Sequence, residues 1–287
     1  MNSVLDSMMS KYPVATSDAE AKNAVKQALQ EITLCGLGRS DFYQNAAFNG
    51  GTALRIFHGL QRFSEDLDFS IDNEKIDTFV LDKYVGCINN ELASLGIPAT
   101  FEVDSKSGLI QRGYIKGNCR EILNCFGTEE TITGRVPANE VLKIKLEADA
   151  AALSAASYET KYLLQPYPTP VRLYDKGTLF AGKVSAVLSR SWKSRVKGRD
   201  LFDYLFYITN EYPMNLAHLE SRLKNNGYLK SYQSFNKDIL KQLLCERFAT
   251  IDYASAKSDV SPFIRDRKVV DFWSADLFIA VTKDFDF

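Results

Sequence analysis

The sequence has few of the residues from which disulfide frameworks and histidine-based metal sites are built. Its 287 residues include five cysteines and two histidines. The number of cysteines is odd and no two of them form a Cys-x-x-Cys pair, which argues against a disulfide framework or a zinc ribbon. His58 and His218 alone are too few for a histidine-rich metal site.

The sequence also lacks long apolar runs and a strong net charge. No run of about 18 apolar residues occurs, so we expect no membrane-spanning helix and no membrane partner. The N-terminus lacks the basic-then-apolar pattern of a signal peptide. Hydrophobic residues make up 45% and charged residues 25%, which is typical of a globular protein. The net charge of −1 gives no indication of a nucleic-acid partner. From the lack of a signal pattern and of a long apolar run, we expect a cytoplasmic location.

The spacing of apolar residues predicts an α/β front domain, residues 1–175, and a mostly helical back domain, residues 176–287. The predicted strands are 46–48, 66–71, 98–104, 110–116, 141–149 and 171–173. The predicted helices are 17–35, 52–60, 75–95, 177–190, 199–211, 215–225, 234–248 and 269–283. A chain of this length can bury a substantial core in two modest domains.

Two aspartates follow a glycine turn in the front domain. Asp66 and Asp68 are two residues apart in a predicted strand, so their side chains project from one face with Cα atoms about 6.5 Å apart. Two carboxylates so close repel each other, and a hard cation such as Mg²⁺ or Mn²⁺ between them relieves the repulsion. Gly50 and Gly51 open the preceding helix, where backbone N–H groups can approach phosphate oxygens. The alternative is a solvated strand face beside an ordinary turn.

A third carboxylate could come from the predicted strand 141–149. Its polar face carries Lys143, Lys145, Glu147 and Asp149, while apolar residues occupy the other face. Glu147 is the first candidate for a third metal ligand and Asp149 the second. The alternative interpretation is the exposed face of an edge strand with mixed charge.

Lys183 lies inside the apolar stripe of the predicted helix 177–190. Leu179 precedes it by four residues and Val187 follows it by four, and lysine is rarely buried without a partner. Either the side chain extends to solvent along the apolar surface, or it reaches into a cleft and meets anionic groups. A triphosphate or the paired aspartates would satisfy it there.

A basic stretch with one tryptophan, Trp192, follows this helix and contains no acidic residue before Asp200. Such a stretch can hold phosphates and stack a base, whereas the alternative is a solvated loop. The candidate RNA-binding residues are Arg190, Lys193, Arg195 and Lys197. Asp200 falls in the first turn of the next predicted helix, and the helix dipole alone can explain an aspartate there.

Three segments together resemble the AbiEii/AbiGii toxin family of nucleotidyltransferases. They are FNGGTALRIFHGLQRFSEDLDFS from residue 48, VLKIKLEAD from residue 141 and LFAGKVSAVLSRSWKSRVKGRDLFDY from residue 179. The resemblance implies an α/β (α+β) core of the DNA polymerase beta type with a small mixed sheet, and a C-terminal helical domain that completes the active site. It also implies an abortive-infection toxin, active in phage defence, that a separately encoded antitoxin neutralises.

The same resemblance implies roles for individual residues. Gly50, Gly51 and Thr52 match the nucleotide-binding turn, with Thr52 supplying the hydroxyl where many relatives carry serine after the first glycine. Asp66 and Asp68 match the metal-binding Asp-x-Asp. Lys183 matches the lysine and Asp200 the later catalytic aspartate of the family. Related toxins use a nucleoside triphosphate, and some modify the 3′ end of tRNA.

We therefore expect a Mg²⁺-dependent nucleotidyltransferase that binds a nucleoside triphosphate and transfers its nucleotide to the 3′ end of an RNA, in particular a tRNA. Asp200 would position or deprotonate the attacking hydroxyl. Two other functions are considered: a metal-dependent nuclease or phosphatase, which would also use paired carboxylates, and a nucleotide-sensing module without catalysis. Binding of nucleoside triphosphates separates the first of these from a nucleotidyltransferase.

Overall fold

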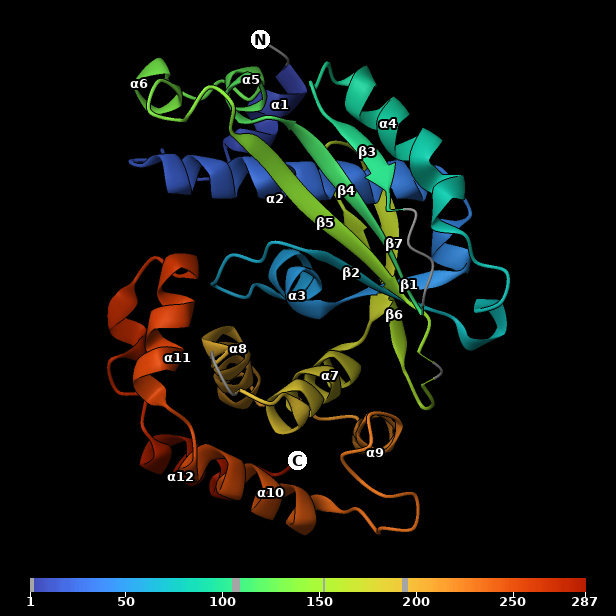
Figure 1. Ribbon diagram of the computed structural model, residues 1–287, viewed down its shortest axis with the longest axis vertical. Helices are drawn as coiled ribbons and strands as arrows, with labels where there is room; N and C mark the ends of the chain where they lie inside the picture. Colours follow the sequence, from blue (N-terminus) through green and yellow to red (C-terminus); the bar gives the residue numbers. More distant parts are fainter. Residues whose placement is uncertain (1–2, 105–108, 152, 193–195) are drawn as a thin grey trace. The chain divides into compact units, whose positions relative to one another are not determined.

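The structure is a computed structural model that describes residues 3–104, 109–151, 153–192 and 196–287 (Figure 1). The chain divides into two compact units. The first unit consists of Met1–Ala53, Ser64–Ala152 and Thr160–Leu173. The second consists of Leu54–Phe63, Leu153–Glu159 and Tyr174–Phe287. The chain therefore leaves and re-enters each unit, and the helix that begins at Gly50 starts in the first unit and continues in the second.

A seven-stranded sheet with the order β3-β4-β5-β2-β1-β7-β6 forms the α/β part of the chain. Its strands are β1 (Ala46–Asn49), β2 (Leu67–Ile71), β3 (Thr100–Val103), β4 (Ile110–Asn118), β5 (Val141–Asp149), β6 (Tyr158–Leu163) and β7 (Thr169–Tyr174). The sheet is mixed, because β2 runs parallel to β5 and antiparallel to β1, and β1 runs parallel to β7. The predicted class, an α/β core with a mixed sheet and a helical remainder, is confirmed.

Strand β5 lies in the interior of the sheet and carries one buried and one polar face. Leu142, Ile144, Leu146 and Ala148 are buried, as the alternation predicts. Its neighbours are β4 on one side and β2 on the other, so the alternative of an exposed edge strand is wrong. The polar face of β5 therefore lies beside the polar residues of two other strands.

Helices of the first unit pack on the sheet and on one another. The long helix α2 (Asp18–Gly38) contacts β5 and helix α4 (Val85–Ser94), and α4 contacts β3 (Figure 1). The Ser17 side chain caps α2 by accepting a hydrogen bond from the Glu20 backbone N–H, as expected for a serine at this position. The other elements here are α1 (Ser3–Met9), α5 (Cys119–Cys125), α6 (Glu130–Thr133), η1 (Phe42–Gln44), η2 (Asn73–Lys75) and η3 (Leu81–Tyr84).

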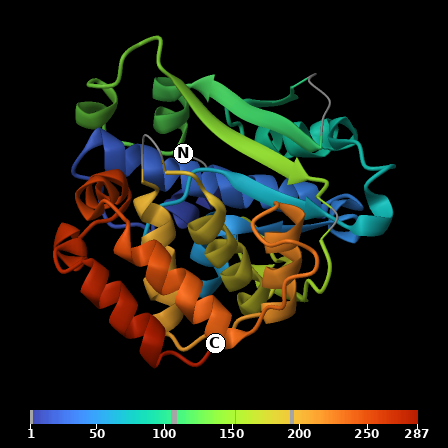
Figure 2. The ribbon, with the colours of Figure 1, turned by 60° about the horizontal axis from the view of Figure 1, so that its bottom comes forward.

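The second unit is helical. Its elements are the end of α3 (Gly50–His58), α7 (Lys176–Ser189), α8 (Gly198–Thr209), α9 (Leu216–Asn225), α10 (Lys237–Ala249), α11 (Tyr253–Val260), η4 (Ser261–Phe263), η5 (Arg267–Val270) and α12 (Ala275–Asp284). Helix α7 packs against α8, α9 and α10, and α10 runs beside α12 (orange and red in Figure 2). Helix α8 packs so closely on α11 that a Cβ atom on Gly198 would overlap the Ala256 carbonyl.

Several short elements differ from the prediction. The single helix predicted over 75–95 is wrong, since the α-helix begins only at Val85. Gln111 of β4 accepts a hydrogen bond from the Leu81 N–H and donates one to the Phe79 carbonyl, which holds this backbone out of a helix. The predicted helix 269–283 is observed only from Ala275. Helices α1, α5, α6 and α11 and strand β6 were not predicted, because they are short and bury few apolar residues.

None of the helices in the described part of the chain combines the length and apolar character that a membrane crossing requires.

Candidate active site

Three carboxylates lie along the polar face where β2 lies beside β5. Asp66 directly precedes β2 and Asp68 lies within it, while Glu147 is the β5 residue in register with Asp68. Lys145 lies among them, with its Nζ atom 3.4 Å from Asp66 Oδ2 and 2.8 Å from Glu147 Oε2. The structure therefore places the two predicted metal ligands and the first candidate for a third at neighbouring positions of the two strands, without gathering the three side chains into one metal-binding group among the described residues.

Glu147 is held by two cations. Besides Lys145, Arg112 of β4 donates a hydrogen bond from Nε to Glu147 Oε1 at 2.6 Å. Burial alone would raise the pKa of Glu147, but the hydrogen bonds from Lys145 and Arg112 bring it below its usual value. Asp149, the second candidate, lies opposite Ser70, and its carboxylate accepts a hydrogen bond from the Ala151 N–H. Glu147 is therefore the candidate that lies beside Asp68.

Burial and neighbouring charge act on Asp66 in opposite directions. Burial raises the pKa of Asp66, and the negative charges of Glu65 and Glu147 add to that effect, whereas Lys145 counteracts it. Burial alone would lower the pKa of Lys145, but the hydrogen bond to Glu147 and the negative charges of Asp66, Glu147 and Asp68 raise it above its usual value. Lys145 is thus the local counter-charge of the carboxylate cluster.

The glycine turn lies directly against Asp68. Gly50 has a φ of +75°, which favours glycine, and a Cβ atom there would overlap the Asp68 carboxylate. Gly50 is therefore required for its backbone conformation and for the space that the carboxylate occupies. The observation links the two predicted motifs, since the turn at the start of α3 and the Asp-x-Asp lie side by side.

Side-chain hydrogen bonds hold the backbone segment that precedes β2. The Thr52 side chain is buried, and its hydroxyl donates to the Asp66 carbonyl. The Gln30 side chain on α2 donates to the Ser64 and Glu65 carbonyls at 3.0 and 2.9 Å. Gln30 was missed by the sequence reasoning, although a glutamine on the apolar face of the predicted helix 17–35 was a signal of a buried polar contact.

The donor set of the cluster fits a hard divalent cation. Asp66 and Asp68 offer carboxylate oxygens, and such ions complete their coordination with water and substrate phosphates. Gly50 leaves open the space into which the Asp68 carboxylate fits. Within residues 3–104, 109–151, 153–192 and 196–287, no three or more His, Cys, Asp or Glu side chains are gathered closely enough to hold an ion. Asp66 and Asp68 would accordingly hold it together with non-protein ligands.

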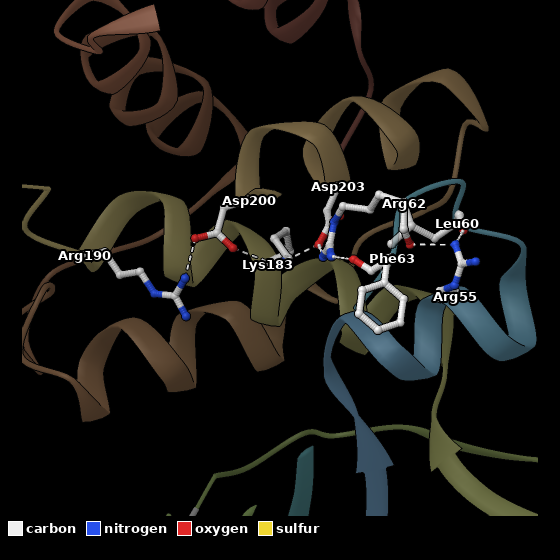
Figure 3. A network of polar contacts seen from close by, with 8 residues as sticks. All are labelled: Arg55, Leu60, Arg62, Phe63, Lys183, Arg190, Asp200 and Asp203. Carbon is white, nitrogen blue, oxygen red and sulfur yellow. Dashed lines mark hydrogen bonds and ion pairs between the residues drawn. The ribbon is translucent and has the colours of Figure 1, made fainter. Parts of the chain in front are cut away.

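A second charged cluster occupies the interior of the helical unit (Figure 3). Lys183 of α7 reaches two carboxylates of α8, with Nζ 2.7 Å from Asp200 Oδ1 and 2.8 Å from Asp203 Oδ2. The Lys183 side chain is only 15% exposed, so it does not extend to solvent as one alternative proposed. Its observed partners are carboxylates of its own unit.

Arg62 completes this cluster. Its Nε and Nη2 atoms each donate to one oxygen of Asp203 at 2.6 Å, and its Nη1 donates to the Phe63 carbonyl (Figure 3). Both partners are buried. The sequence reasoning missed Arg62 and Asp203, although Arg62 comes four residues before Asp66 and Asp203 three after Asp200. The closeness of these two charged residues to predicted site residues in the sequence was the signal by which they could have been found.

Asp200 is buried with both of its oxygens engaged. Lys183 contacts Oδ1, and Arg190, which is half exposed, donates to Oδ2. Burial alone would raise the pKa of Asp200, but the charges of Lys183 and Arg190 lower it below its usual value. The carboxylate therefore remains ionised and fixed in orientation.

The basic stretch after α7 is described in part. Trp192 lies against the Arg247 guanidinium, whose Cζ atom is 4.1 Å from the indole ring. Lys197 immediately precedes α8 and is partly exposed. Lys193 and Arg195, two of the four candidate RNA-binding residues, lie outside the described residues.

Comparison with protein families identifies the chain. The model of the nucleotidyl transferase AbiEii toxin family, described as a type IV toxin–antitoxin system, matches residues 32–281. The chain belongs to the AbiEii family. AbiEii membership makes it a nucleotidyltransferase of the toxin type, and implies a nucleoside triphosphate as substrate and a separately encoded antitoxin. A comparison with curated protein sequences finds no match.

Two solved structures share the fold of this AbiEii protein at low sequence identity, and a third has a lower TM-score. JHP933 from Helicobacter pylori is 18% identical with a TM-score of 0.55, over 94% of this chain and 92% of that one. A second structure, described as a nucleotidyltransferase from H. pylori, is 19% identical with a TM-score of 0.52, over 90% and 92% of the two chains. MenT4, a nucleotidyltransferase toxin from Mycobacterium tuberculosis, is 13% identical with a TM-score of 0.49, over 100% and 90%.

Proposed function

We propose that this AbiEii protein transfers a nucleotide from a nucleoside triphosphate to the 3′ end of an RNA, in particular a tRNA, with Mg²⁺ or Mn²⁺ as cofactor. The observation that carries the proposal is the contact of the Gly50 turn with Asp68. A turn without a side chain, lying beside a carboxylate pair, suits a ligand that brings both a metal ion and phosphates. Abortive infection in phage defence and a cytoplasmic location belong to the same proposal.

In the proposed reaction, a hydroxyl oxygen of the RNA forms a bond to the α-phosphorus of the triphosphate. The bond from that phosphorus to the bridging oxygen breaks, pyrophosphate leaves, and the hydroxyl proton passes to water. The divalent cation supplies charge neutralisation for the triphosphate when it is bound. Asp66 and Asp68 would hold it, and Glu147 is the third carboxylate within the cluster.

The remaining site residues would bind and orient the substrate. We assign phosphate binding to the backbone N–H groups of Gly50, Gly51 and Thr52, because the Thr52 hydroxyl already donates to the Asp66 carbonyl. Lys183 would contact a phosphate oxygen while Asp200 and Asp203 fix its ammonium. Asp200 positions rather than deprotonates, because both of its oxygens are engaged by cations.

The acceptor RNA would contact the basic stretch from Arg190 to Lys197. In this division of labour, residues 1–175 supply the metal-binding carboxylates, and residues 176–287 supply Lys183 and Asp200. The front and back domains therefore each contribute essential groups.

The test is transfer of label from each of the four nucleoside triphosphates to total RNA in the presence of Mg²⁺. Asp66→Asn and Asp68→Asn should each reduce transfer by at least about 100-fold, since even weakening the outer shell of a metal site costs 10–100-fold. Both variants should remain folded, because the substituted side chains lie on a polar face of the sheet. Thermal unfolding verifies this.

Glu102→Gln is the matched control, because it removes an exposed carboxylate from β3 of the same sheet. It should transfer label as the wild type does. Wild-type activity in either aspartate variant would contradict the metal assignment. Hydrolysis of RNA without incorporation of label would identify a nuclease, and triphosphate binding without any reaction would identify a nucleotide-sensing module.

A further inference from the structure

Lys145 occupies a particular place in the carboxylate cluster. Its Nζ atom contacts Asp66 Oδ2 at 3.4 Å and Glu147 Oε2 at 2.8 Å, and Asp68 acts on it through charge. Two of the three carboxylates therefore direct an oxygen at the same ammonium. A cation that Asp66 bound through Oδ2 would compete with this ammonium for the same oxygen.

A divalent cation and this ammonium compete for the same oxygens. The cluster carries three carboxylates, and in the described part of the chain Lys145 and Arg112 contact two of them, Asp66 and Glu147. Among the described residues, Arg112 contacts Glu147, whereas Lys145 contacts both Glu147 and the predicted metal ligand Asp66. An ion that binds Asp66 must either displace the Lys145 ammonium or tolerate a like charge within about 4 Å of it.

We infer that Lys145 is an internal counter-ion of the metal site, and this inference rests on the proposed function. Its ammonium neutralises Asp66 and Glu147 while the site holds no divalent cation, and it must leave Asp66 before the cation can bind both aspartates. Divalent cations alone therefore bind weakly. The triphosphate favours their binding, because it brings additional ligands for the cation and anionic oxygens for the displaced ammonium.

The strand offers a matched control for the removal of this charge. Lys143 lies two residues earlier on the same face of β5, and its Nζ atom lies 3.5 Å from the centre of the Tyr114 ring. Lys145→Met and Lys143→Met change the net charge of the protein equally. Only the first removes the cation that contacts Asp66.

The experiment measures binding of Mn²⁺ alone by electron paramagnetic resonance, in the absence of nucleotide. Lys145→Met should bind Mn²⁺ at least about 10-fold more tightly than the wild type, whereas Lys143→Met and Lys145→Arg should bind it as the wild type does. Lys145→Gln removes the same charge with a polar side chain and should reproduce the gain. Mn²⁺ should correspondingly raise the melting temperature of Lys145→Met more than that of the wild type.

The outcomes separate this inference from the proposed function. Mn²⁺ affinity in Lys145→Met and Lys145→Gln that equals or falls below that of Lys143→Met overturns the counter-ion role. Adding Asp66→Asn to Lys145→Met should abolish the gain, which locates the ion at Asp66. If Asp66→Asn leaves the Mn²⁺ affinity of every variant unchanged, the proposed metal site itself is wrong.

Discussion

Lys183 carries a charge into the interior of the helical unit and shares it between two carboxylates. Its partners Asp200 and Asp203 each have a second cation, Arg190 for the first and Arg62 for the second. Three cations therefore face two carboxylates. The excess of positive charge is compatible with the proposed contact of Lys183 with a phosphate.

At this residue, Lys183→Met should separate folding from nucleotide binding. Each aspartate keeps one cationic partner, so the loss in stability should not exceed about 6 kcal/mol, the upper range for the two hydrogen bonds to charged groups that are lost. Nucleotide affinity and transfer should both fall by at least about 100-fold, because the proposed phosphate contact is lost. Urea unfolding and binding of a labelled triphosphate measure the two effects.

Lys176→Met is the control for Lys183→Met, since it removes a lysine from the same helix that contacts the Tyr212 ring instead of a carboxylate. It should bind the triphosphate normally. Unchanged triphosphate affinity in Lys183→Met would limit this lysine to a structural role.

Helix α8 contacts the segment that connects α3 to β2. This contact organises the charged cluster of the helical unit. Arg62 belongs to that connection, and its guanidinium binds Asp203 of α8 through both oxygens. Arg55 on α3 donates to the Leu60 and Arg62 carbonyls, which fixes the backbone of the same connection (Figure 3). Arg62 thus anchors the segment that precedes the predicted metal ligands in the chain.

A double-mutant cycle tests this anchor. Arg62→Met should destabilise the protein by about 3–5 kcal/mol, because it leaves a buried carboxylate with one cation fewer. Asp203→Leu should destabilise it comparably by leaving Arg62 unpaired. The double variant should be less destabilised than the sum of the two, since no uncompensated charge remains between these positions. Additive free energies of unfolding would show that the pair makes no specific contribution.

A strand could be predicted from the sequence where its buried and exposed residues alternate regularly. Strand β5 was predicted over its full length, because its apolar residues occupy every second position. Strand β6 was not, since only Leu163 among its residues is buried. The backbone near Phe79 is held by the Gln111 side chain from a distant strand, a contact that no local pattern contains.

The candidate site was predictable to a different extent. Asp66, Asp68 and Glu147 were identified from strand spacing, and the structure places them at neighbouring positions of the two strands. Arg62 and Asp203 were not identified, because their pairing spans 141 positions of the chain. Spacing within one element is visible in a sequence, but pairing between distant elements depends on the tertiary fold.

At the scale of the whole molecule, the nearly neutral net charge contrasts with the basic stretch after α7. If this stretch holds the RNA, the affinity for RNA should fall as the salt concentration rises. In a plot of the logarithm of the binding constant against the logarithm of the salt concentration, each phosphate contacted in a single strand contributes about 0.7 to the slope. Replacing Lys193 and Arg195 with glutamine should reduce the slope by about 1.4 and leave triphosphate binding unchanged.

Replacing Lys237 and Lys241 on α10 with glutamine is the control for this experiment, since it removes the same charge elsewhere in the second unit. This variant should keep the wild-type slope. An equal reduction in both double variants would indicate that only net charge matters and that the basic stretch is a solvated loop.

The way the chain is divided between its two units has a consequence for its gene. Because the second unit includes residues 54–63 and 153–159 as well as 174–287, a recombination event with one break anywhere between codons 54 and 173 combines parts of a unit from different parents. Such hybrids would join segments that did not evolve together within one core. Functional chimaeras with a single break in this range are therefore expected to be rare.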